Sequence, residues 1–270
     1  MKTSLYIIEP ISNLHVGSGK ENFGVVDNLI QRDVTTNLPS INASSLKGAM
    51  REHLKRKLPN ESIVQLFGSD PVGANAKSGS CRFFDAHLLA IPVRGERSPY
   101  YLATCPQVIT DWQYQLEMLC VPNAGDLIAD LKKLLDVGQD VALKIKTPDR
   151  DVDIRIEDLP RRVSLRADNM IYAGSKRLKK LFREQDVLIL SNKCFRELCD
   201  DFHLPIIARN HLVNGESKNL FYEQVLPRYS LLYFVTMESV DGLDLSLNEE
   251  LVQIGANASV GNGFCKLRKW

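Results

Sequence analysis

The sequence lacks the signals that most quickly assign a chain to a class. None of its six cysteines forms a Cys-x-x-Cys pair, and no apolar run approaches the roughly eighteen residues that a membrane-spanning helix needs. The scattered cysteines are typical of reduced core residues, and the cluster Cys194, Cys199 and His203 offers zinc no obvious fourth ligand. The apolar stretch 5–8 is too short for a signal-peptide core, so we expect a cytoplasmic protein.

Two common nucleotide-binding signatures are also missing. Gly17-Ser18-Gly19 follows a predicted strand, but the next glycine is Gly24, so the spacing GxGxxG is not satisfied. Gly19-Lys20 is followed by Glu21 and lacks the upstream glycine of a Walker loop. We therefore set aside dinucleotide and nucleoside-triphosphate binding through these motifs.

The charge of the chain is small in total but unevenly distributed. The net charge of +1 argues against a protein that coats nucleic acid through overall basicity. Basic residues gather within 47–57, 150–166 and 176–183, whereas 229–265 contains no Lys or Arg. Such a chain can offer a basic groove on one face. From charge alone, ordinary solvated surfaces are the slightly favoured interpretation.

Strand-like and helix-like stretches alternate without a strict βαβ repeat, which predicts an α+β fold with a ferredoxin-like (RRM-like) core. A long glycine-containing N-terminal loop is expected over 16–42, and a helical insertion over about 111–204. Within the insertion, helices are expected over 111–119, after Ser175 to about 184 and after Ser191 to about 201. Asn214-Gly215 is a turn signal with extended stretches on both sides. The segment at about 206–227 is therefore predicted to be a projecting β-hairpin.

A helix is predicted to begin at Ser44-Ser45, with an apolar face formed by Leu46, Ala49, Met50 and Leu54. Its basic residues form a pattern suited to phosphate binding. Backbone N–H groups at a helix start can meet an anion, with the helix dipole assisting. Lys47 and Arg51 follow one turn apart and could hold neighbouring phosphates. A capped helix with a solvated basic stripe explains the same pattern about as well.

Four groups of motifs succeed one another along the chain, and the segment 111–204 carries none of them. They are HVGSG from His15, GVVDNLIQRD from Gly24 and SSLKGAMR from Ser44; LFGS from Leu66 and FFDAHLLAIPVR from Phe83; IARN from Ile207 and LFYEQVLP from Leu220; and QIGANASVGNGF from Gln253. Together these motifs resemble the signature of the RAMP superfamily. More narrowly, they resemble the backbone subunit of type III-B (Cmr) CRISPR effectors.

The resemblance implies a single RAMP-type palm domain over 1–270, with the hairpin at about 206–227 acting as a thumb. It implies copies of the chain assembled along a CRISPR RNA, together with other subunits of an effector complex. The thumb would wedge between guide and complementary single-stranded target RNA, so that the target is cut at regular intervals. No membrane partner is expected.

The resemblance also assigns roles to individual residues. Asp27 occupies the position of the catalytic aspartate, and His15 and Glu223 occupy positions that line the same site. RNA carries its own nucleophile, the 2′-OH, so Asp27 could act as a base or hold a divalent metal ion, Mg²⁺ or Mn²⁺. RNA contacts are assigned to Ser44, Ser45, Lys47, Arg51, Arg209, Gly261 and Gly263. Asp33 and Asp85 are interpreted as structural.

Four alternatives stay open at this point. Without the resemblance, Asp27 is more typical of an Asx turn and His15 of a structural histidine. The chain could be a backbone subunit that binds guide RNA without cutting, for which a carboxylate at position 27 is unnecessary. It could also be a stand-alone CRISPR RNA-processing nuclease with a histidine-centred site, or the related type III-A subunit, although Gln31-Arg32 and Pro92-Val93-Arg94 favour type III-B.

Overall fold

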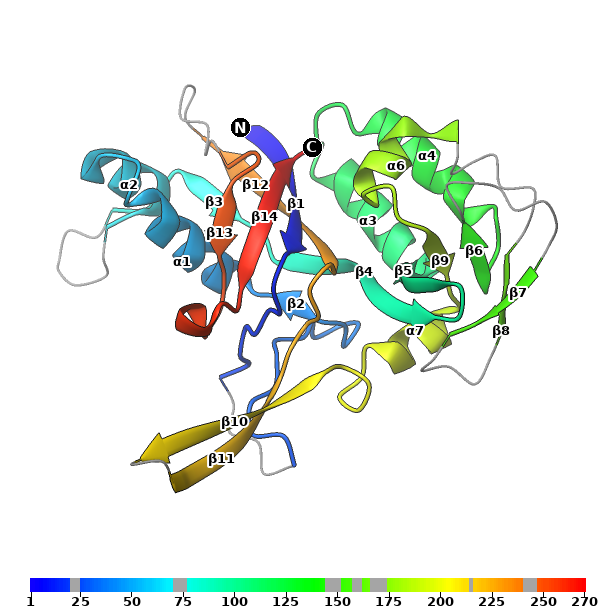
Figure 1. Cartoon of the computed structure of the whole chain (residues 1–270). Helices are drawn as coiled ribbons and strands as arrows, with labels where there is room; N and C mark the ends of the chain where they lie inside the picture. The colour runs from blue at the N-terminus through cyan, green and yellow to red at the C-terminus, as the bar shows by residue number, and fades with distance from the viewer. Residues whose placement is uncertain are drawn as a thin grey trace. The chain divides into compact units, whose positions relative to one another are not determined.

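The computed structural model describes residues 1–19, 25–69, 77–143, 152–156, 162–165, 174–213, 216–239 and 247–270 (Figure 1). Within them the chain divides into two compact units, which we call unit 1 and unit 2. Unit 1 is formed by Met1–Leu88 and Leu204–Trp270, and unit 2 by Leu89–His203. The expected single domain over 1–270 and the insertion limits of 111–204 stay predictions.

Unit 1 is built on antiparallel strands in the order β13-β14-β1-β12, with β3 also paired to β12. In β1 and β12 the apolar runs are almost entirely buried, which explains their lack of polar alternation. Tyr6 of β1 lies opposite Phe234 of β12, and their rings stack at 5.1 Å. The strands are β1 (Lys2–Pro10), β3 (Cys81–Phe83), β12 (Leu231–Glu238), β13 (Leu251–Gln253) and β14 (Phe264–Lys269).

Two helices and a short strand complete this part of unit 1. The helix α1 (Ala43–Leu54) buries Leu46, Met50 and Leu54, as their spacing predicts, and packs against β3, β13 and α2 (Asn60–Phe67). The strand β2 (Ser40–Ile41) leads into α1 and pairs with the beginning of β4 (Ala86–Gly95), whose later residues belong to unit 2.

Where a projecting hairpin was expected, β10 (Ile206–Val213) and β11 (Glu216–Gln224) pair as an antiparallel two-stranded sheet of their own (Figure 1), and the thumb role stays a prediction. Its register pairs Ile206 with Gln224 at the base. The first five residues of β11 are exposed and the last two are buried, so the described part of this strand is anchored at the base of the hairpin. The turn expected at 214–215 lies outside the described residues.

Unit 2 combines a mixed sheet with four described helices. The β5–β9 and β6–β8 pairs are parallel, and β4–β5, β6–β9 and β7–β8 are antiparallel. The short helices expected after Ser175 and Ser191 are confirmed, with each hydroxyl accepting a backbone N–H as a cap. The elements are β5 (Ser98–Thr104), α3 (Pro106–Met118), α4 (Gly125–Leu135), β6 (Val141–Leu143), β7 (Val152–Arg155), β8 (Arg162–Leu165), α6 (Lys176–Leu181), β9 (Val187–Ile189) and α7 (Asn192–Leu198).

One boundary in unit 2 differs from expectation. The helix α3 was expected to begin near Asp111, whereas it begins at Pro106. A proline is suited to the first turn of a helix because its missing N–H has no intrahelical partner there.

The mixture of strands and helices agrees with the expected α+β class, and the ferredoxin-like core stays a prediction. Across the described ranges, no helix is long and apolar enough to cross a membrane.

Candidate functional site

Asp27 lies where the N-terminal loop runs beside the base of the β10–β11 hairpin. Its Oδ2 accepts a hydrogen bond of 2.7 Å from the backbone N–H of Tyr222. The N–H groups of Asp27 and Asn28 both donate to the carbonyl of Tyr222 at 3.1 Å, and Asn28 forms a parallel bridge with Glu223. The exposed Asp27 side chain is therefore held by a strand that lies far away in the sequence.

His15 is buried in the same unit, with 4% of its surface exposed. Its Nδ1 lies 2.6 Å from the carbonyl oxygen of Gln224, and because a carbonyl can only accept, Nδ1 carries the proton. In a neutral ring Nε2 is then the basic nitrogen, and Gly17 leaves space beside it, since a Cβ there would lie 3.2 Å from Nε2. The structure gives His15 a scaffolding role, and its part in proton transfer stays a prediction.

Glu223 is also buried, with 7% of its surface exposed. Its Oε2 accepts a hydrogen bond of 3.0 Å from Arg209 Nη1 across the hairpin and one of 2.9 Å from Asn257 Nδ2. A buried carboxylate needs such partners, because an isolated charge away from water is costly. Glu223 and Arg209, expected in catalysis and in RNA binding respectively, thus bind each other. Asn257 was not singled out by any feature of the sequence.

The two glycines expected to contact RNA, Gly261 and Gly263, differ in their surroundings. Both have left-handed backbones, with φ of 82° and 78°. A Cβ on Gly263 would lie 2.1 Å from a backbone carbonyl oxygen of the same loop, whereas a Cβ on Gly261 would meet nothing within 4 Å. Gly263 is therefore required by the fold of the loop. Gly261 has open space beside its backbone, as a close RNA contact would need.

Gln31 connects the N-terminal loop to the beginning of α1. Its Nε2 donates to the carbonyl of Gly17 and to Oγ of Ser45, both at 3.1 Å, and its Oε1 accepts the N–H of Asn42 at 2.8 Å. Ser45 thus takes part in holding the loop in place. Ser44, the other serine expected to bind RNA, is exposed.

The N-terminus of α1 has a carboxylate partner from the same chain. The N–H of Ala43 donates to Asp85 Oδ1 at 2.6 Å. A negative charge is favourable at this end of a helix because the helix dipole is positive there. One of the N–H groups at the helix start, where an RNA phosphate was expected, is therefore already occupied by Asp85, which was expected to be structural.

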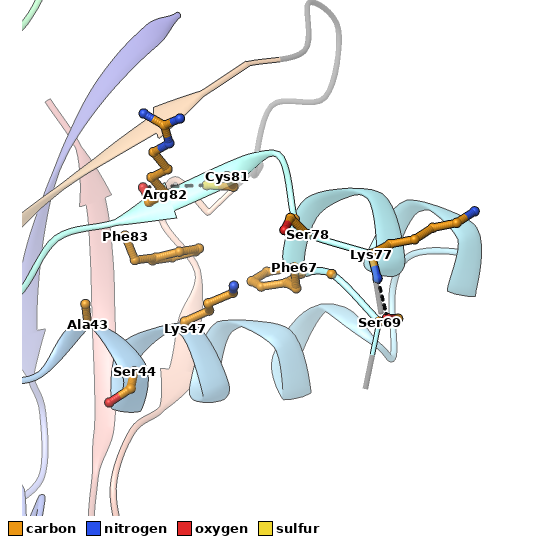
Figure 2. A pocket seen from close by; sticks show the side chains of 12 residues that line it. Ala43, Ser44, Lys47, Phe67, Ser69, Lys77, Ser78, Cys81, Arg82 and Phe83 are labelled. Atoms are coloured by element: carbon orange, nitrogen blue, oxygen red, sulfur yellow. Dashed lines mark hydrogen bonds between the residues drawn. The ribbon is translucent and has the colours of Figure 1, made fainter. Parts of the chain in front are cut away.

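Lys47 lines a cavity of about 520 Å³ beside α1 (Figure 2). Figure 2 shows its side chain extending toward Phe67, while Arg82 extends away from α1. No carboxylate side chain is among the described residues of the lining. The lining residues are Ala43, Ser44, Lys47, Phe67, Gly68, Ser69, Lys77, Ser78, Gly79, Cys81, Arg82 and Phe83.

The pKa of the Cys81 thiol, in the cavity wall, is affected by the charge of Lys47. Burial raises the pKa of the Cys81 thiol to about 12, the nearby Glu238 carboxylate adds to the rise, and the Lys47 ammonium opposes it. Lys47 is therefore close enough to act on this thiol. An ammonium in a cavity whose described lining holds no carboxylate side chain is suited to an anionic group such as a phosphate.

Six of the residues predicted for the site form two groups within unit 1. Asp27, Glu223 and Arg209 gather at the base of the hairpin, with His15 attached through the backbone of Gln224. Ser44 and Lys47 line the cavity beside α1. Three partners were missed by sequence reasoning, namely Gln31, Asn257 and the backbone of Tyr222, because each acts through a contact between segments that are distant in sequence.

A divalent metal ion does not fit the donor groups seen here. Glu223 is already paired with Arg209, and Asp27 is held by a backbone N–H. Within the part of the chain that the structure describes, no group of three or more His, Cys, Asp or Glu side chains is arranged to hold a metal ion. That includes Cys194, Cys199 and His203, of which the two cysteines are buried and His203 bonds Asp200.

Comparison with known proteins points to one family. The RAMP superfamily model matches residues 7–266. The CRISPR system Cmr endoribonuclease Cmr4 of Pyrococcus furiosus is 29% identical over 290 residues, covering 99% of this chain and 95% of that protein. The CMR subunit Cmr4 of Saccharolobus solfataricus is 43% identical over 91 residues, covering 33% of this chain and 29% of that protein.

Solved structures show the same fold. A chain in the type III-B Cmr-beta complex bound to cognate target RNA superposes with a TM-score of 0.82 at 21% identity, covering 100% of this chain and 97% of that one. Oligomeric Cmr4 from Pyrococcus furiosus superposes with a TM-score of 0.70 at 24% identity, covering 100% of this chain and 98% of that one.

Proposed function

The chain belongs to the RAMP superfamily, and we propose that it is the backbone subunit of a type III-B CRISPR effector that cuts RNA complementary to its guide. The observation that carries the proposal is the exposed carboxylate of Asp27, fixed at the base of a projecting hairpin. The whole-length similarity to a Cmr endoribonuclease supports it. So does the fold shared with a subunit of a target-bound complex.

The proposed reaction uses the 2′-OH of the target as the nucleophile. Asp27 takes the 2′-OH proton, the 2′ oxygen bonds to the adjacent phosphorus, and the bond from phosphorus to the 5′ oxygen breaks, with that oxygen leaving protonated by water. Such acid–base assistance is typically worth about 10² to 10⁴ in rate. The hairpin, acting as a thumb, would splay the target so that the 2′ oxygen, the phosphorus and the leaving oxygen come into line.

Guide RNA is the proposed partner of the surface around α1. Lys47 and Arg51 would hold neighbouring phosphates, with Ser44 and the backbone beside Gly261 completing the contact. Further copies of the chain and the other effector subunits would assemble on the same guide, in the cytoplasm. A ferredoxin-like palm as the platform for these contacts belongs to this proposal.

The need for Mg²⁺ or Mn²⁺ stays a prediction of the family resemblance. Because the described carboxylates do not form a set of metal ligands, the proposed reaction assigns every step to Asp27, the RNA and water. Chelation of divalent ions in an assembled complex tests the requirement directly.

The test is a reconstituted complex with a labelled target complementary to the guide. We expect cuts at regular intervals, and we expect a target with a single 2′-deoxy nucleotide at one cut position to resist cutting at that position alone. Cutting at the deoxy position would exclude the 2′-OH mechanism. A complex that binds the target and never cuts it would favour the non-cutting backbone subunit. One observation supports that alternative. The Asp27 carboxylate accepts the N–H of Tyr222, so the residue has a structural role whether or not it cuts.

A further inference from the structure

We propose that Asn257 is a positioning residue that couples the glycine-rich loop, residues 254–263, to the strand that holds Asp27. The inference rests on the proposed function, because it concerns how the cutting carboxylate is kept in place. It assigns to the loop a task inside the protein in addition to any contact with RNA.

The coupling begins with the side chain of Asn257. Its Nδ2 donates to Glu223 Oε2 at 2.9 Å, the same oxygen that accepts Arg209 Nη1 at 3.0 Å. The arginine balances the charge of the buried carboxylate, and the amide adds a second hydrogen bond without adding charge. A neutral donor is therefore the chemical type that this position needs.

The backbone of Asn257 is held just as firmly by the loop. Its φ of 67° is left-handed, a conformation that asparagine tolerates better than most residues. Its carbonyl accepts the N–H groups of Val260 and Asn262, each at 3.2 Å. Ala256, directly before it, donates its N–H to the carbonyl of His15 at 2.9 Å. A shift of the loop must consequently move the amide that holds Glu223.

The other end of the coupling is the path from Glu223 to Asp27. Glu223 follows Tyr222, whose N–H binds the Asp27 carboxylate and whose carbonyl accepts the N–H groups of Asp27 and Asn28. The N–H of Gln224 donates to the carbonyl of Asn28 at 2.9 Å. Residues 222–224 of β11 thus determine where the carboxylate lies. Anchoring Glu223 anchors that stretch.

The loop is also placed to receive a ligand on its outer side. Residues 258–261 are exposed, whereas Asn257 and Gly263 are turned toward the protein. RNA bound to the exposed side would hold the loop in one conformation. Asn257, through its hydrogen bond to Glu223, would then hold the cutting site in place as well. This arrangement ties cutting to occupancy of the loop by RNA.

The experiment compares Asn257→Gly with Asn123→Gly in the assembled complex. Glycine keeps the left-handed backbone and removes only the amide, and Asn123 is an exposed left-handed asparagine in unit 2 that gives a matched control. We expect Asn257→Gly to lower the single-turnover cutting rate by about tenfold with KM and guide affinity unchanged, since a hydrogen bond to a charged group is worth about that factor. Asn257→Asp should lower the rate further, because it places a second carboxylate against Glu223.

Two further measurements test the route of the effect. In a Glu223→Ala background, Asn257→Gly should add less than about a twofold loss, because coupled residues are not additive. In the isolated chain without RNA, the amide of Tyr222 should exchange with solvent at least about fivefold faster in Asn257→Gly than in wild type. The exchange result stands even if the wild-type complex does not cut, so failure of the coupling and failure of the proposed function are distinguishable.

The proposal is overturned if Asn257→Gly cuts as fast as the Asn123→Gly control. It is also overturned if the losses from Asn257→Gly and Glu223→Ala simply add, or if exchange at Tyr222 is unchanged. Reduced guide affinity with an unaltered cutting rate would instead make Asn257 an RNA contact and reject the positioning role.

Discussion

The carboxylate of Asp27 and the backbone N–H of Tyr222 are joined by a hydrogen bond of 2.7 Å. The bond fixes the N-terminal loop to the last part of β11, so the proposed cutting group and the hairpin share one anchor. It also means that the charge of Asp27 and its hydrogen-bonding shape can be varied separately, because an amide oxygen accepts the same N–H.

Asp27→Asn keeps the bond to Tyr222 and removes the charge. We expect target cutting to fall by at least about a hundredfold, because a neutral amide cannot act as a base. Guide binding and target affinity should stay near wild type, since phosphate contacts dominate affinity. Cutting is measured on a labelled target, and affinity by filter binding of the same target.

The results for Asp27→Asn distinguish three interpretations of the role of Asp27. Lost cutting with intact binding supports the catalytic role. Loss of binding would make Asp27 a structural residue only. Unchanged cutting would move the active site elsewhere, with His15 the next residue to test, or assign the activity to another subunit.

Replacing Lys47 and Arg51 together by Ala tests the guide surface. If both contact phosphates, the slope of log affinity against log salt should become shallower by about one to two, with an equal loss for all guide sequences. Lys55→Ala is the control, because Lys55 lies one turn further along the same segment and pairs with Glu52 at 3.2 Å in solvent. A slope equal to that of the control would mean that Lys47 and Arg51 are ordinary solvated residues that do not contact phosphates.

Gly261→Ala and Gly263→Ala form a matched pair. The first adds a methyl group in open space at a left-handed φ, so we expect a loss of about 1 kcal/mol in the free energy of unfolding. The second drives a Cβ into a backbone carbonyl and should cost more than about 3 kcal/mol. Urea unfolding of the isolated chain measures both. Equal losses would contradict the geometry of this loop.

The turn at Asp33 should make stability depend on acid pH. Burial raises the pKa of Asp33, but hydrogen bonds from Thr36 and Thr35 and the nearby His87 outweigh it and hold that pKa below its ordinary 3.8. A lowered folded pKa adds stability that is present above about pH 4 and is lost as pH falls through the folded pKa. Asp33→Asn should therefore cost about 1 kcal/mol at pH 7 and progressively less below pH 4. A constant difference from pH 7 to pH 2 would contradict this.

Deleting 213–220 removes the outer part of the hairpin. The described side chains lost from β11 are exposed, so the isolated chain should keep its unfolding transition. The regular spacing of cuts should disappear, because the wedge that separates target segments is gone. If the deletion unfolds unit 1, the hairpin belongs to the core and is not a thumb.

Sequence reasoning succeeded where structure is local. The spacing of Leu46, Met50 and Leu54 placed the buried face of α1, and Ser175 and Ser191 capped helices as expected. It failed where side chains from distant segments meet. Nothing near Asp85 or Asn257 in the sequence indicates that one caps α1 and the other binds Glu223, since such pairings depend on how the strands of unit 1 are assembled.

The two ends of the hairpin differ in what they tolerate as engineering sites. At the base, the side-chain oxygen of buried Gln224 accepts the N–H of Ile30, and its backbone carbonyl accepts a hydrogen bond from His15. A substitution at the base would therefore disturb the segments around Ile30 and His15. The exposed outer part has no such ties among its described residues. Lengthening it by two residues on each strand would preserve the inward and outward alternation of side chains. We therefore expect that the reach of the hairpin can be changed at its outer end and not at its base.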